Sequence, residues 1–262
     1  MTNEIIFTDR MKISYSLLSK NAEKWVIAFY GYGQQADVFA PLAKTLEGKY
    51  NLLVIDLPLA AEPTAIEKKT FITFLEELTT LYQIKKITGV SYSMGSRFNL
   101  VMAECRPDLI EKLILVAPDG IRMRIWNRFS TSTLLGTYIF RYLVESKNAY
   151  ATWIRFLYQL KLMPKSMYAF SKWHMRDLEC RSKVYNAWMN MKEMIPTLRT
   201  LRINQSRYAF DIIAFFGESD SIINHACRKK LARHIPSAKI VTLKKGHNLL
   251  DEELFNTIVE LL

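Results

Sequence analysis

The chain has 262 residues, half of them hydrophobic, and its 36 Lys and Arg against 25 Asp and Glu give a formal net charge of +11. This apolar content excludes a disordered or low-complexity polymer, because it provides enough apolar surface for a folded core. The charge leaves three kinds of anionic partner open, namely nucleic acid, a membrane surface and a small molecule.

Short apolar runs alternate with longer amphipathic stretches along most of the chain. Strands are predicted at 5–7, 11–16, 25–30, 52–55, 87–92, 113–116, 212–216 and 239–243, with a turn at 9–10. Helices are predicted at 66–82, 94–105, about 225–234 and from about 249, where apolar residues recur at helical spacing. Strands separated by amphipathic helices indicate an α/β fold, with a mostly parallel sheet flanked by helices.

Residues 121–205 break this alternation and are predicted to form a helical cap inserted between core strands. They contain 15 Lys and Arg against 4 Asp and Glu, whereas the rest of the chain contains 21 of each kind. They also hold four of the five tryptophans, Trp126, Trp153, Trp173 and Trp188. The predicted organisation is therefore a first core part (1–120), the cap (121–205) and a second core part (206–262).

The three cysteines, Cys105, Cys180 and Cys227, are scattered, without a disulfide framework or metal-ligand spacing. The first residues lack the positive charge and the apolar stretch of a signal peptide. No run of about 18 apolar residues could span a bilayer. We therefore expect a reducing, cytoplasmic location, no metal and no cofactor.

The segment Gly89-Val90-Ser91-Tyr92-Ser93-Met94-Gly95 lies where a predicted strand ends and a helix begins. A nucleophile on so sharp a turn needs small residues two positions before and after it, and Ser91 and Gly95 surround Ser93 in this way. The helix that starts at Met94 directs free N–H groups and the positive end of its dipole toward Ser93. This pattern favours a reactive serine, although a serine-rich turn without chemistry has the same pattern.

Candidate partners for Ser93 follow the last two predicted strands. Asp220 ends the segment Phe216–Asp220, and His247 lies directly after the strand at 239–243. All three residues sit at carboxyl ends of strands, where open α/β sheets bind their ligands. Asp119, after the strand at 113–116, is the alternative residue to orient the histidine, and Glu218 is a weaker candidate.

The elbow around Ser93 and the chain order Ser93, Asp220, His247 resemble the α/β-hydrolase-fold proteins that carry a helical cap, over essentially the whole chain. The segment Asp56-Leu57-Pro58 resembles a D-x-P segment of that family. The resemblance implies that Ser93 is the nucleophile, His247 the general base and Asp220 the residue that orients the imidazole.

The same resemblance implies an oxyanion hole formed by the backbone N–H groups of Tyr32 and Met94, with Gly31 in the oxyanion loop. The chain departs from the family pattern at two positions. Tyr30 stands where the family usually has a histidine before Gly31, which puts the geometry of this loop in question. Ser91 replaces the first glycine of the elbow, a change that the turn should tolerate.

Arg97 lies one helical turn after Ser93 and has two interpretations. It is either an arginine on the helix surface or, together with Tyr30 and Gly31, a contact for an anionic substrate. The run Ser93–Arg97 resembles the elbow of the menaquinone-pathway synthase, a lyase of the same fold that binds a polyanionic substrate with arginines.

The other candidate side chains receive structural interpretations. His225 and His234 fall on one predicted helix as surface or packing residues, and His174 lies in the insertion, with a ligand contact as its alternative. Cys105 and Cys180 are expected to be buried small residues rather than nucleophiles.

The predicted function is a serine hydrolase that cleaves an ester, thioester or related acyl bond of a small, hydrophobic and optionally anionic substrate. The alternatives are a triad-dependent carbon–carbon lyase or hydrolase on a polyanion, and a binding protein that keeps the fold without chemistry. No nucleic-acid module is recognisable. Contact of the basic cap with a membrane surface is a secondary hypothesis, and the oligomeric state is not predicted.

Overall fold

The computed structural model describes residues 3–8, 11–56, 64–123, 125–163 and 165–262. Their contacts divide the chain into two compact units. The core unit consists of Met1–Leu57, Glu67–Arg122 and Met194–Leu262. The helical unit consists of Pro58–Ile66 and Met123–Glu193.

An eight-stranded sheet forms the centre of the core unit. Its strands are β1 (Asn3–Thr8), β2 (Met11–Ser19), β3 (Lys24–Phe29), β4 (Tyr50–Asp56), β5 (Ile87–Tyr92), β6 (Ile110–Val116), β7 (Asp211–Gly217) and β8 (Lys239–Leu243). They lie in the order β1-β2-β4-β3-β5-β6-β7-β8, with β2 antiparallel to its two neighbours and every other pairing parallel. The predicted α/β class with a mostly parallel sheet is confirmed, whereas the turn predicted at 9–10 lies outside the described residues.

The central strands are apolar because both faces of the sheet are covered. All six residues of β5 are buried, as are the last four of β3. Helices on the two faces leave no solvated side for alternating polar residues, and such strands appear in the sequence as continuous apolar runs. The continuous pattern at 25–30 and 87–92 thus follows from their central place in the sheet.

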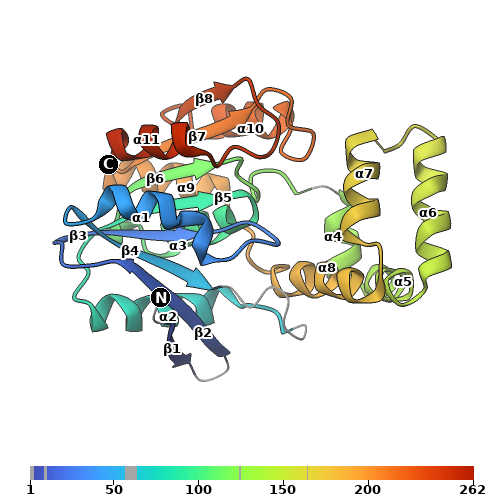
Figure 1. Cartoon of the computed structure of the whole chain (residues 1–262), viewed down its shortest axis with the longest axis horizontal. Helices are drawn as coiled ribbons and strands as arrows, with labels where there is room; N and C mark the ends of the chain where they lie inside the picture. Colours follow the sequence, from blue (N-terminus) through green and yellow to red (C-terminus); the bar gives the residue numbers. More distant parts are fainter. Residues whose placement is uncertain (1–2, 9–10, 57–63, 124, 164) are drawn as a thin grey trace. The chain divides into compact units, whose positions relative to one another are not determined.

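The helices of the core unit form two groups around the sheet (Figure 1). They are α1 (Ala40–Leu46), α2 (Lys68–Leu81), α3 (Ser96–Cys105), α9 (Leu198–Tyr208), α10 (His225–His234) and α11 (Glu252–Leu261), with 3-10 turns η1 (Ala36–Phe39), η2 (Ser93–Gly95) and η3 (Pro107–Leu109). Helix α1 packs against α11, while α2 contacts α3, α3 contacts α9, and α9 contacts α10. Each of these helices packs through an apolar side. In α2, the buried apolar stripe consists of Phe71, Phe74, Leu75 and Leu78.

The helical unit contains five helices and no described strand. They are α4 (Ile125–Ser132), α5 (Leu134–Glu145), α6 (Lys147–Gln159), α7 (Lys165–His174) and α8 (Leu178–Asn190). Side chains of Thr133, Ser146 and Asp177 cap the starts of α5, α6 and α8 by accepting backbone hydrogen bonds. These side-chain caps mark the starts of three of the five helices.

Side chains from several helices meet inside the helical unit. Phe140 of α5 packs against Tyr185 and Trp188 of α8. Arg181 is buried and its Nε donates to the carbonyl of Val144 at 2.6 Å, at the end of α5. This bond supplies a positive partner to helix carbonyls that have no intrahelical donor.

The boundaries of the inserted unit differ from those predicted from the sequence. The prediction extended it to 205, but α9 belongs to the core unit. The Nδ2 atom of Asn204 donates to the carbonyls of Ala103 and Glu104 at the end of α3, which ties α9 to the core. Conversely, Ile66 joins the helical unit, where its N–H donates to the carbonyl of Asn190 at 2.8 Å.

Within the described residues, none of the helices combines the length and the apolar character needed to cross a membrane.

Candidate active site

The serine at the end of β5 sits in a strained turn. Ser93 has a φ of +49°, a left-handed conformation that costs free energy for a residue other than glycine. Gly95 allows the turn to approach β3, since a Cβ there would lie 2.4 Å from the carbonyl oxygen of Phe29. Ser91 is buried and its Oγ donates to Ser96 Oγ at 3.1 Å, so the elbow accommodates serine in place of the family's glycine.

Three side chains from distant parts of the sequence form one hydrogen-bonded chain. Ser93 Oγ lies 3.0 Å from His247 Nε2, and His247 Nδ1 lies 2.7 Å from Asp220 Oδ2. The Asp220 side chain is fully buried, and its Oδ1 accepts the N–H groups of Ile222 and Ile223 at 2.8 and 2.9 Å. Asp220 is thus fixed on both oxygens, and it holds the imidazole with its other nitrogen toward Ser93.

The loops that carry Asp220 and His247 are held against each other by close backbone contact. At Gly217 a Cβ would lie 2.2 Å from the carbonyl oxygen of Gly246, so only glycine fits. The N–H and the Oγ of Ser219 both donate to the carbonyl of Lys245, at 3.2 and 3.1 Å. The separation of the acid and the imidazole is therefore set by the backbone of these two loops.

Tyr92 is a support for the imidazole loop that sequence reasoning did not identify. Its hydroxyl donates to the carbonyl oxygen of His247 at 3.0 Å, and its ring lies 5.5 Å from the imidazole, centre to centre. Burial, with a contribution from the charge of Asp220, raises the pKa of Tyr92 to about 12. The phenol therefore remains a hydrogen-bond donor across the physiological pH range.

The predicted oxyanion loop follows β3. Gly31 donates its N–H to Gln34 Oε1 at 2.9 Å, and a Cβ at Gly31 would lie 2.9 Å from the ring of Tyr92. Tyr32 follows in the turn, and Met94 lies in η2 directly after the serine. The roles of Tyr32 and Met94 as oxyanion donors and of Gly31 as a substrate contact remain predictions.

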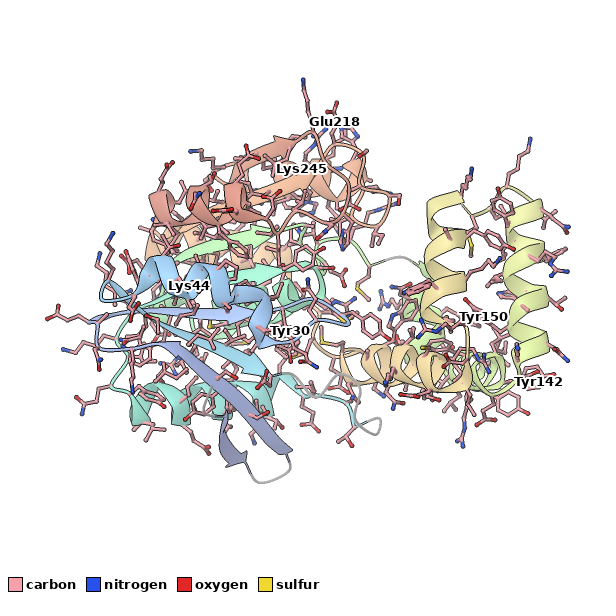
Figure 2. All side chains as sticks on the ribbon, in the orientation of Figure 1. Tyr30, Lys44, Tyr142, Tyr150, Glu218 and Lys245 are labelled. Atoms are coloured by element: carbon pink, nitrogen blue, oxygen red, sulfur yellow. The ribbon has the colours of Figure 1, made fainter. Side chains whose placement is uncertain are left out.

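Tyr30, at the position of the family's histidine, is buried at the end of β3 and is labelled in Figure 2. Its hydroxyl donates to Asp56 Oδ1 at 3.3 Å, and Ser16 Oγ donates to Asp56 Oδ2 at 3.4 Å. Burial raises the pKa of Asp56, against the opposing effect of these two hydrogen bonds. The Tyr30 side chain thus supports the end of β4, and its role as a substrate contact remains a prediction. Leu57 and Pro58, the rest of the predicted D-x-P segment, lie outside the described residues.

Arg97 and Asp119 form an ion pair beside the elbow. Arg97 is only 5% exposed, and its Nε and Nη2 both lie within 2.8 Å of Asp119 Oδ2. The backbone N–H of Asp119 donates to the carbonyl of Ser93 at 3.0 Å. The interpretation of Arg97 as a surface residue is therefore wrong, and Asp119 faces Arg97 rather than His247.

The remaining candidates lie apart from this cluster. Glu218 is exposed, and His225 and His234 occupy the two ends of α10. The side chain of His174 lies outside the described part of the structure. Cys105 is exposed and Cys180 half-buried, which corrects the expectation that both are buried. Cys105 is the last residue of α3, and Cys180 lies in the first turn of α8. Among the described residues, no group of three His, Cys, Asp or Glu side chains could hold a metal ion.

Comparison with known proteins identifies the family of the chain. A family model described as alpha/beta hydrolase fold matches residues 24–254. The chain belongs to the alpha/beta hydrolase fold family. A curated relative, the uncharacterized hydrolase YugF of Bacillus subtilis (strain 168), is 24% identical over 123 residues, 44% of this chain and 44% of that protein. The α/β-hydrolase resemblance inferred from the elbow is thus confirmed.

Solved structures of similar fold cover nearly the whole chain. An esterase from Thermogutta terrifontis matches with a TM-score of 0.68 and 15% identity over 100% of this chain and 98% of its own. An enol-lactonase from Burkholderia xenovorans LB400 matches with a TM-score of 0.66 and 16% identity over 98% of each chain. A structure from work on carboxylesterases of Nitrososphaera gargenis gives a TM-score of 0.67 and 14% identity over 98% and 97%. At these identities the likeness concerns the fold.

Proposed function

We propose that this alpha/beta hydrolase is a serine esterase in which Ser93 is the nucleophile, His247 the general base and Asp220 the residue that orients the imidazole. The observation that carries the proposal is the unbroken hydrogen-bonded chain from Ser93 Oγ through both ring nitrogens of His247 to Asp220. A serine needs such a base, and the base needs such an orienting group, to attack an acyl carbon at neutral pH.

In the acylation step, His247 Nε2 accepts the proton of Ser93 as Oγ forms a bond to the substrate carbonyl carbon. The negative charge passes to the carbonyl oxygen, which the N–H groups of Tyr32 and Met94 stabilise in this proposal. Collapse of the intermediate breaks the bond to the leaving alcohol or thiol, which takes the proton from His247. Water then attacks the acyl-enzyme by the same route and regenerates Ser93.

The buried carboxyl group of Asp220 accepts hydrogen bonds from two backbone N–H groups and pairs with the imidazole of His247. This carboxylate fixes the tautomer in which Nδ1 carries the proton and Nε2 faces Ser93, and it stabilises the imidazolium that forms during attack. Tyr92 also helps to position His247, because its hydroxyl donates a hydrogen bond to the backbone carbonyl of that residue. The machinery needs only residues of the core unit and no metal ligand or cofactor-binding residue.

The proposed substrate is a small ester or thioester with a hydrophobic acyl group, and an anionic group on it is compatible with the net charge. Esterases, carboxylesterases and a thioesterase domain from the curacin biosynthetic pathway share this fold. A cytoplasmic location stays a prediction.

The geometry does not favour the two alternative functions. The lyase hypothesis needs Arg97 as a free carboxylate anchor, yet two of its nitrogens lie within 2.8 Å of Asp119 Oδ2. The hypothesis of a binding protein without chemistry rested on Tyr30 in place of histidine, and Tyr30 instead makes its own hydrogen bond to Asp56.

The test is turnover of a panel of p-nitrophenyl esters and acyl thioesters of two to twelve carbons by the wild type, Ser93→Ala and Ser91→Ala. Ser93→Ala should reduce kcat by about 10⁴-fold or more, to the level left by binding and the oxyanion hole. Ser91→Ala, two residues before the nucleophile, should keep kcat within about threefold. It removes only the hydrogen bond between the neutral hydroxyl groups of Ser91 and Ser96. Equal activity of Ser93→Ala and the wild type would exclude the proposal.

A further inference from the structure

Helix α5 of the helical unit is apolar on both of its sides. Its inner side packs through Gly136, Phe140 and Val144 into the unit. Its outer side exposes five large apolar residues, Leu134, Leu135, Tyr138, Ile139 and Tyr142. At about 100° per residue these five lie within an arc of about 140°, which only Glu145, the last residue of the helix, shares, and we call the five the outer α5 face. A single exposed leucine is ordinary, but five large apolar side chains exposed on one side of a helix indicate a contact surface.

The side chains of this face are much more exposed than a residue of the same type inside the helical unit. Leu134 is 96% exposed, Tyr138 72% and Tyr142 56%, whereas Tyr150 on the next helix is 7% exposed and donates to the carbonyl of Ser171. Figure 2 labels Tyr142 and Tyr150, the exposed and the buried tyrosine of neighbouring helices. Thr137, Arg141 and Glu145 separate the two apolar sides of α5 along one edge. Within the helical unit, the described helices cover only the inner apolar side, and the outer α5 face is left exposed.

The neighbouring helices add exposed aromatic side chains to the same unit. On α6, Trp153 and Phe156 are exposed, with ring centres 6.1 Å apart. On α7, Trp173 is 66% exposed and carries the guanidinium of Arg176 over its ring at 4.9 Å. Tryptophan and tyrosine combine an apolar body with a polar edge, which suits the boundary between water and the apolar part of a bilayer.

Charge identifies the kind of surface that fits. Residues 123–193 hold 12 Lys and Arg but only 4 Asp and Glu. Three of those acids are already paired within the unit, Glu145 with Arg141, Asp177 with Arg176 and Glu179 with Lys183. In the described part of the chain, the exposed cations Lys147, Arg155, Lys161 and Lys165 form no ion pair. The unit therefore presents positive charge that no acid of its own neutralises.

We propose that the helical unit docks through the outer α5 face onto an anionic lipid surface, with its unpaired cations contacting the headgroups. A lipid surface offers both an apolar layer and negative charge, and amphipathic basic helices bind such a boundary. A nucleic acid would meet the cations but offers no layer for five exposed apolar side chains. A second copy of the chain would cover the apolar face but would bring two positively charged units together.

The test is flotation of the full-length protein with vesicles of phosphatidylcholine alone or with about 30% phosphatidylglycerol, at low and high salt. The wild type should partition into the anionic vesicles and lose most of this binding at about 0.5 M salt, where headgroup attraction is screened. The double variant Leu135→Ser/Tyr138→Ser should reduce the partition coefficient at least about tenfold, because it removes two of the apolar side chains that the proposal inserts into the bilayer. The double variant Lys161→Gln/Lys165→Gln should lower binding to anionic vesicles by about threefold to tenfold.

The matched control is Leu81→Ser/Ile203→Ser, which removes two comparably exposed apolar residues from the core unit and should leave flotation unchanged. Circular dichroism and turnover of a soluble ester show that each variant is folded. Absence of flotation with both vesicle types would overturn the proposal, as would equal flotation of wild type and Leu135→Ser/Tyr138→Ser. A dimer in light scattering that this variant dissociates, without lipid binding by the wild type, would assign the face to a second copy. Because the readout is binding, its failure leaves the proposed esterase function untouched.

Discussion

The core unit and the helical unit place similar apolar residues in opposite environments. In the core unit, β5 is buried along its whole length and delivers Ser93 to a turn fixed by glycine and serine contacts. In the helical unit, α5 leaves five large apolar side chains in contact with solvent. The difference agrees with the two proposals, in which the core unit positions the catalytic groups and the helical unit offers a docking surface.

The two units also differ in how their charges are paired. In the core unit, two cations with little exposure meet opposite charges: Arg97 meets Asp119, and Lys68 meets Glu104. In the helical unit, residues 123–193 hold 12 basic and only 4 acidic residues. We therefore expect substitutions in the core unit to act on chemistry or folding, and surface substitutions in the helical unit to act on association.

The largest expected effect distinguishes Asp220 from Asp119. Asp220→Asn should lower kcat by about 10³-fold to 10⁴-fold, because the amide no longer stabilises the required tautomer and charge of His247. Asp119→Asn should cost less than about tenfold, since that carboxylate faces Arg97. Steady-state kinetics on one short ester measures both variants. A greater loss in Asp119→Asn than in Asp220→Asn would assign the orienting role to Asp119.

The next effect concerns the contact between the two loops of the site. Gly217→Ala should lower the free energy of unfolding by about 2–3 kcal/mol, because its Cβ would collide with the backbone of Gly246 and force the loops apart. Gly246→Ala is the matched control, since the nearest atom to its Cβ, Ser219 Oγ, would lie 3.9 Å away. Urea unfolding of both variants provides the comparison, and equal destabilisation would show that this approach does not constrain the site.

Arg97 tests whether the ion pair beside the elbow positions Ser93 or binds substrate. Arg97→Ala should lower kcat for a neutral ester about tenfold with little change in KM, because Asp119 loses the partner that holds it against the Ser93 carbonyl. Arg97→Lys should recover part of kcat, since it keeps the charge but not the planar geometry. If instead KM for anionic esters rises while kcat for neutral esters is unchanged, Arg97 is a substrate anchor.

The smallest expected effect compares one buried tyrosine from each unit. Burial raises the pKa of both Tyr92 and Tyr150 to about 12, against about 10 in the unfolded chain. The folded state therefore binds each phenol proton more tightly than the unfolded chain does. This difference stabilises the fold fully below pH 10, and the stabilisation is lost as the pH rises through 12. Near pH 11, Tyr92→Phe or Tyr150→Phe should remove little phenolate absorbance from the folded protein.

The control for these variants is the same measurement in urea, where each replacement should remove the absorbance of one phenolate. A full loss already in the folded protein would show that the tyrosine concerned is accessible to solvent.

Much of the core unit could be predicted because local pattern and chain order determine it. Apolar runs located the strands, and residues after parallel strands must meet at one edge of the sheet, which brought Ser93, Asp220 and His247 together. The hydrogen bonds of Tyr92 and Tyr30 could not be predicted, because they depend on side-chain directions across neighbouring elements.

The limit of the inserted unit was predicted less well for a related reason. Helix α9 has the same periodicity whether it packs in the helical unit or on α3, so its sequence did not reveal its place. The bonds of Asn204 to the end of α3 decide this question only in three dimensions. The burial of Arg97 was missed because Arg97 lies in α3, whereas its partner Asp119 lies 22 residues later, on the loop after β6.

The central claim is that Ser93 is a nucleophile activated by His247. The most direct measurement is the intact mass of the protein after a fluorophosphonate probe, with digestion to locate the label. The account predicts one adduct, on the peptide that contains Ser93, with labelling absent in Ser93→Ala and at least about 10²-fold slower in His247→Ala. An unlabelled wild type of native fold, or equal labelling rates in the wild type and His247→Ala, would contradict it.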